Sequence, residues 1–110
     1  MIPYPSELSE NEVQTKLYNL LIRNGLDARC QVMASDRKSL FDIVIYVNKS
    51  AILIIEVKKK RGKLGSGEQI HRYRQYGVKA IYCQGEDDIK SCVKVAFNKV
   101  RHVYKELNPV

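Results

Sequence analysis

Two apolar segments separated by three polar residues constrain the fold more than any other feature of this sequence. Segments 40–47 and 51–58 are rich in β-branched and aromatic residues, which favours extended strands. The connection Asn48-Lys49-Ser50 is short and polar, which favours a tight turn. The sequence therefore predicts an antiparallel hairpin in which residues whose numbers sum to about 98 face each other.

A single acidic residue interrupts each of these strands, and the predicted register brings the two acids together. Asp42 lies in the first strand, and Glu56 follows an apolar run in the second. Two facing carboxylates repel each other unless a proton or a cation lies between them. Oxygen ligands of this kind suit Mg²⁺ or Mn²⁺. Lys58 shares a strand face with Glu56, so an ordinary structural ion pair is the alternative explanation.

The rest of the chain predicts further helices and strands around this hairpin. A capping-box sequence at residues 9–12 predicts a helix that ends at Gly25. The remaining elements are two strands, at 28–34 and 79–84, and two helices, at about 66–76 and from Glu86 onward. The predicted order is α-β-β-β-α-β-α, a single α/β domain over residues 1–110 with a mixed central sheet flanked by helices.

The chain is strongly basic, with a formal net charge of +7. This excess favours a polyanionic partner, of which nucleic acid is the commonest, whereas a merely soluble basic protein is the alternative. Cations concentrate between residues 58 and 74, beside the predicted carboxylate pair. Phosphate contacts are expected from five of these cations, Lys59, Lys60, Arg61, Lys63 and Arg72.

Three cysteines and the lack of long apolar runs bear on where the protein works. No run approaches the roughly 18 apolar residues that cross a bilayer, so no membrane partner is expected. The first five residues lack the basic and apolar regions of a secretory signal. Cys30, Cys83 and Cys92 lie in apolar contexts, so buried thiols in a reducing cytoplasm are expected. A zinc site is not expected, because the spacings match no finger.

The acids and the lysine together resemble the pattern of the PD-(D/E)XK nuclease superfamily. That family has an acid on one strand, Glu/Asp-x-Lys on the next strand, and a further acid on the first helix. The matching positions are Asp42, Glu56, Lys58 and Glu12. One departure is Phe41, which stands where the family usually has a proline before the first acid.

A second motif extends the resemblance. Gln69 and Tyr73 match the Gln-x-x-x-Tyr motif of the RecB-type branch. The order of segments is also similar to stand-alone virus-type replication-repair nucleases and to type I restriction nuclease domains. The match covers nearly the whole chain, from Glu12 to Gln84. It implies a restriction-endonuclease-like fold and a cytoplasmic protein of a bacterial, archaeal or phage-infected cell.

The resemblance also implies a role for each site residue. Asp42 and Glu56 would hold Mg²⁺ or Mn²⁺, and the Val57 carbonyl could be a third ligand. Lys58 would orient the attacking water or stabilise its hydroxide form. Glu12 would reach the metal, although the capping box alone explains a glutamate at that position.

Gln69 and Tyr73 are four residues apart and share one face of a helix. The resemblance implies that they brace the catalytic lysine or contact DNA phosphate. Ordinary surface exposure for Gln69 and core packing for Tyr73 are the alternatives.

The activity implied is that of a metal-dependent DNA endonuclease or nickase. A chain this small has no room for a sequence-reading domain, so recognition of branched or junction DNA is expected. Cutting both strands would need a homodimer, a higher oligomer or two separate events. An exonuclease, an inactive nucleic-acid-binding module on the same fold, and a basic interaction protein with an acidic partner are the alternatives.

Overall fold

The computed structural model describes residues 2, 7–34, 36–38, 40–59 and 77–108. In chain order the elements are α1 (Glu10–Arg23), β1 (Asp27–Met33), β2 (Leu40–Val47), β3 (Ser50–Lys58), β4 (Lys79–Gln84), the 3-10 helix η1 (Glu86–Asp88) and α3 (Ile89–Leu107). The four predicted strands are confirmed to within one residue at each end. The helix predicted at 66–76 lies outside the described residues.

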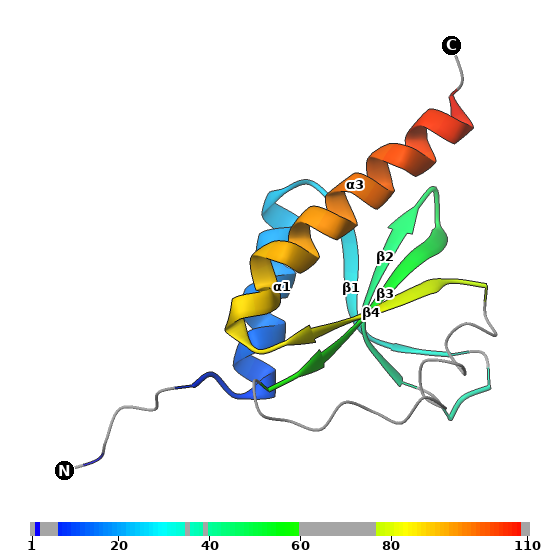
Figure 1. Cartoon of the computed structure of the whole chain (residues 1–110). Coiled ribbons are helices and arrows are strands. Elements are labelled where there is room, and N and C mark those ends of the chain that lie inside the picture. Colours follow the sequence, from blue (N-terminus) through cyan, green and yellow to red (C-terminus); the bar gives the residue numbers. More distant parts are fainter. Residues whose placement is uncertain (1, 3–6, 35, 39, 60–76, 109–110) are drawn as a thin grey trace.

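The four strands form one mixed sheet in the order β1-β2-β3-β4 (Figure 1). Strands β1, β2 and β3 pair antiparallel, whereas β4 pairs with β3 in parallel. The carboxyl ends of β3 and β4 therefore lie at the same edge of the sheet. The Gly85 N–H joins these ends by donating to the Lys58 carbonyl over 2.7 Å. The predicted α/β class and the mixed sheet are thus confirmed.

The predicted β2–β3 hairpin has the expected register. Ile43 pairs with Ile55, so the residue numbers sum to 98 as predicted. The register shifts by one residue close to the turn, where Val47 pairs with Ser50. Asn48 and Lys49 form the turn with φ of 49° and 67°. Positive φ at both central residues is the signature of a type I′ turn, whose twist matches that of paired strands.

Both helices cover the same face of the sheet (Figure 1). Each helix buries one stripe of apolar residues at helical spacing, which explains why these segments are helical. The stripes are Val13, Leu17 and Leu21 on α1, and Ile89, Cys92, Ala96 and Val100 on α3. They pack against alternate residues of β2 and β3, including Ile43, Ile45, Leu53, Ile55 and Val57, to form the main core.

A smaller apolar group lies on the opposite face of the sheet. Its buried members are Ala34, Phe41, Val44 and Ile54. Because side chains alternate along a strand, Glu56 and Lys58 share the face of Ile54. The two charged residues of the predicted centre thus lie on the sheet face that α1 and α3 leave uncovered.

The predicted burial of the cysteines is confirmed at two positions and wrong at the third. Cys83 and Cys92 are buried, whereas Cys30 is exposed. Cys30 belongs to β1, an edge strand in which only Ala28 is buried. Cys83 lies on the other edge strand, β4, but it is buried in the main core together with Cys92 of α3, whereas Cys30 is not part of that core.

Among the described residues, no helix is both long enough and apolar enough to cross a membrane.

Candidate active site

The site begins with an irregular row that crosses the first two strands. Gln31 of β1 has φ of 54° and lies between the pairs Cys30↔Ile43 and Val32↔Phe41, so it stands beside Asp42 of β2. Alternation also breaks in β2 at this row, because Phe41 and Val44 pack in the same apolar group although they are three residues apart. The side chains around Asp42 therefore do not alternate strictly between the two faces of the sheet.

The Asp42 carboxylate is directed toward the neighbouring strand β3. Its Oδ2 accepts a hydrogen bond of 2.8 Å from the Val57 N–H. The regular β2–β3 pairing ends at Ile43↔Ile55, so this side chain satisfies a backbone donor beyond the last pair. That N–H belongs to the peptide that joins Glu56 to Val57. The structure thus brings Asp42 to the backbone of Glu56, as the predicted register requires.

Glu56 is the one buried charged residue among those that the structure describes. Only 6% of its surface is exposed. Removing a carboxylate from water is costly, so a cation or several hydrogen bonds must compensate the charge. Its surroundings combine the apolar residues Ile54 and Ala80 of the outer face with the polar ends of β3 and β4.

Strand β4 adds polar groups to the same row. Glu56 lies beside Tyr82 in the parallel register, and Lys58 lies beside Gln84. Parallel partners point to the same face of a sheet, so these four side chains share the outer face. The Tyr82 hydroxyl is buried and makes no hydrogen bond with the described part of the chain. Sequence reasoning missed Tyr82, although the predicted parallel crossover strand could have indicated it.

Lys58 is half-buried at the end of β3. Its backbone is held by the 2.7 Å hydrogen bond from Gly85, which fixes the point where the strand ends. Lys59 follows it and is exposed, and its predicted phosphate contact stays a prediction. A cation at this place would lower the energy of negative charge that develops near Glu56.

Glu12 is exposed on the first turn of α1 and takes part in the predicted capping box. The Ser9 N–H donates to Glu12 Oε1 over 3.1 Å, and the Glu12 N–H donates to Ser9 Oγ over 3.3 Å. Hydrogen bonds from the Ser9 backbone and then from its side chain lower the pKa of Glu12. The first turn of α1 lies near the carboxyl end of β3 in Figure 1.

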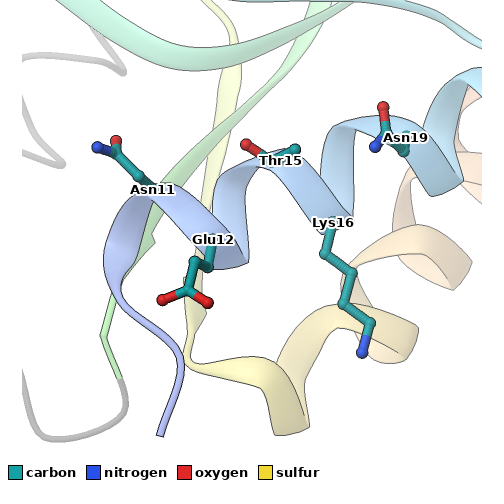
Figure 2. A pocket seen from close by; sticks show the side chains of 5 residues that line it. All are labelled: Asn11, Glu12, Thr15, Lys16 and Asn19. Carbon is teal, nitrogen blue, oxygen red and sulfur yellow. The ribbon is translucent and has the colours of Figure 1, made fainter. Parts of the chain in front are cut away.

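Glu12 also lines a cavity of about 430 Å³ on the exposed side of α1. Figure 2 shows Glu12 and Lys16 pointing the same way from the helix, away from Asn11 and Thr15. Lys16 forms an ion pair with Glu86 of η1. The pair links the middle of α1 to the segment that follows β4.

A complete set of protein metal ligands is not assembled in the described ranges. No group of three His, Cys, Asp or Glu side chains is placed to hold an ion there. The Asp42 carboxylate contacts the peptide between Glu56 and Val57, and the Glu56 side chain is itself a buried carboxylate. Oxygen-only donors suit a hard divalent cation that keeps several waters, as Mg²⁺ does.

Six of the predicted site residues, Lys60, Arg61, Lys63, Gln69, Arg72 and Tyr73, lie outside the described residues. Comparison of the chain with models of protein families, with curated proteins and with solved structures found no match.

Proposed function

We propose that this chain is a metal-dependent deoxyribonuclease with its active centre at Asp42, Glu56 and Lys58. The observation that carries the proposal is the 2.8 Å hydrogen bond from the Val57 N–H to Asp42. It holds the Asp42 carboxylate against the backbone of Glu56 and Val57. Glu56 is itself a buried carboxylate, and Lys58 follows it two residues later. A protein that only needed a stable sheet would gain from apolar residues at these positions.

The strand order supports a restriction-endonuclease-like core for this proposal. In such a core, the strand with the first acid lies next to the strand with the Glu-x-Lys triplet. A fourth strand lies beside the triplet strand and runs parallel to it. Here β2 and β3 are antiparallel neighbours, and β4 follows β3 in parallel. This arrangement directs Glu56 and Lys58 to one face at the edge where both strands end.

Each residue then has a task that follows from its position. Asp42 and Glu56 would hold a Mg²⁺ or Mn²⁺ ion, which lowers the pKa of a bound water and offsets charge on the phosphate. Asp42 Oδ2 is oriented by the Val57 N–H, so this carboxylate needs little reorganisation. Lys58 would orient the attacking water from the same strand face, and Tyr82, the register partner of Glu56, has a buried hydroxyl without a hydrogen-bond partner in the described part of the chain.

The proposal is tested by the nicking of supercoiled plasmid DNA. With Mg²⁺ or Mn²⁺ the protein should convert plasmid to the open-circular form, and chelator should stop it. Glu56→Gln removes one charge with little change in shape and should lower the rate at least about a hundredfold. Glu106→Gln makes the same chemical change at an exposed residue of α3 and should leave the rate unchanged. Equal rates for both variants would rule out the proposed centre.

A second candidate is an inactive DNA-binding module on the same fold. Two observations favour it: Glu12 is engaged with Ser9, and no three-ligand group exists among the described residues. Such a module would bind duplex DNA in chelator and in Mg²⁺ alike, and it would nick no plasmid under any condition. Four-way junction and end-labelled linear DNA in the same assay separate endonuclease, exonuclease and junction-selective cleavage.

A further inference from the structure

Helix α3 carries a line of exposed cations on the side opposite its buried stripe. The members of this line, here called the cationic stripe, are Lys90, Lys94, Arg101 and Lys105. At 3.6 residues per turn they fall within about 60° of the helix circumference. The buried residues of α3 lie on the other side, against the sheet, so the stripe points to solvent.

Acids lie near only one end of the stripe among the described pocket linings, where Glu86 and Asp87 line a pocket together with Lys90. None of its four members forms an ion pair with a described residue. Glu106 is the one acid of α3, and it lies 3.0 Å from His102. The helix fixes three lysines and one arginine in a row. Such a row of positive charges attracts a polyanion whose charges are regularly spaced.

Two further features of α3 suit nucleic acid. Phe97 and Tyr104 lie along one side of the stripe with 40% and 48% of their surfaces exposed, so they offer aromatic faces to sugars or bases. A cavity of about 270 Å³ is lined by Asn98, Arg101, His102 and Lys105. Its amide, guanidinium and ammonium groups are hydrogen-bond donors of the kind that contact phosphate oxygens.

Helix α3 places the stripe across the sheet from the proposed active centre. The helix begins just after β4, at the edge where Gly85 bonds to Lys58, and its later turns project beyond the sheet (Figure 1). From Lys90 to Lys105 the stripe extends about 22 Å, which is the length of about six base pairs. The stripe faces solvent on the side of the sheet that the helices cover, whereas Glu56 and Lys58 lie on the other face, so a duplex on the stripe would be a segment separate from one at the active centre.

We propose that the cationic stripe binds the phosphate backbone of a duplex DNA segment outside the active centre. The inference rests on the proposed function, because it takes DNA as the substrate. A second bound segment would let a small nuclease favour branched DNA, whose arms can occupy both places. An anionic membrane is a poorer occupant, because a membrane-surface helix buries its apolar face in lipid, and that of α3 is buried in the core.

The test measures binding without cleavage. Fluorescence anisotropy of a labelled duplex of about 30 base pairs is recorded in chelator over a range of salt concentrations. The double variant Lys94→Gln, Lys105→Gln should lower the slope of log affinity against log salt by about 1.8, because each lost contact contributes about 0.9. At about 0.1 M salt the affinity should fall by up to about sixty-fold.

The matched control is Lys49→Gln, Lys79→Gln, which makes the same changes at exposed residues that do not belong to α3. Its salt slope should equal that of the unmodified protein. Equal slopes for the two double variants would overturn the inference. So would a stripe variant that binds DNA normally but loses binding to phosphatidylglycerol vesicles. Plasmid nicking by the unmodified protein is measured separately. If the protein nicks plasmid but the two double variants have equal salt slopes, only the proposal about the cationic stripe is refuted. If the stripe variant changes the salt slope but the protein nicks no plasmid, only the proposed nuclease activity is refuted.

Discussion

At the scale of single residues, Asp42 has two separable tasks, one structural and one chemical. Its carboxylate satisfies the Val57 N–H, and Val57 is only 2% exposed. Asp42→Ala leaves that donor buried without a partner and should lower the free energy of unfolding by about 1–3 kcal/mol. Asp42→Asn keeps an oxygen acceptor and should cost less, although it should lose nicking. Urea unfolding of the two variants measures the difference, and equal stability of both would contradict the structural task.

Glu12 gives a prediction about pH. Its pKa is lowered in the folded protein by the hydrogen bonds from Ser9, so its contribution to stability is present above the unfolded pKa and is lost as pH falls through the folded pKa. The unmodified protein should therefore be more stable than Glu12→Gln at neutral pH, and the two should converge as pH falls below the ordinary value of 4.5. Thermal unfolding at several pH values measures this, and a constant difference would exclude the capping carboxylate.

At the scale of elements, the β2–β3 turn holds a residue that is poorly suited to its conformation. Lys49 has φ of 67°, where a side chain other than that of glycine is strained. Lys49→Gly should raise the free energy of unfolding by about 0.5–1 kcal/mol. Lys49→Ala is the control, because it removes the side chain but retains the strain. Stabilisation by both variants would show that the lysine charge, and not its backbone, is unfavourable.

For the last helix, the sequence predicted the existence of the helix correctly but not the residue at which it begins. A helix is predicted from Glu86, whereas residues Glu86–Asp88 form a 3-10 turn and α3 begins at Ile89. The Asp88 carboxylate accepts the Gln84 N–H over 2.8 Å and so ties the turn back to β4. Asp88, one of the acids predicted to lie at the start of a helix, therefore joins that turn to the end of β4.

At the scale of the whole molecule, much of the sheet could be predicted because it depends on local pairing. The register that faces Ile43 with Ile55 follows from a short turn and an apolar pattern, and it led directly to Asp42 beside the Glu56–Val57 peptide. Contacts that depend on the long connection to β4 were harder. Tyr82 stands beside Glu56 in the register only through the parallel pairing of distant segments, and the exposure of Cys30 depends on which strand residues the helices cover.

Titration with Mn²⁺ followed by electron paramagnetic resonance shows whether Asp42 and Glu56 together hold one divalent cation. The unmodified protein and Glu106→Gln should bind one Mn²⁺ with the same affinity. Glu56→Gln and Asp42→Asn should each bind it roughly tenfold or more weakly, because each loses a charged oxygen ligand. If all four proteins bind Mn²⁺ equally, or if none binds it, these two carboxylates are not a metal centre.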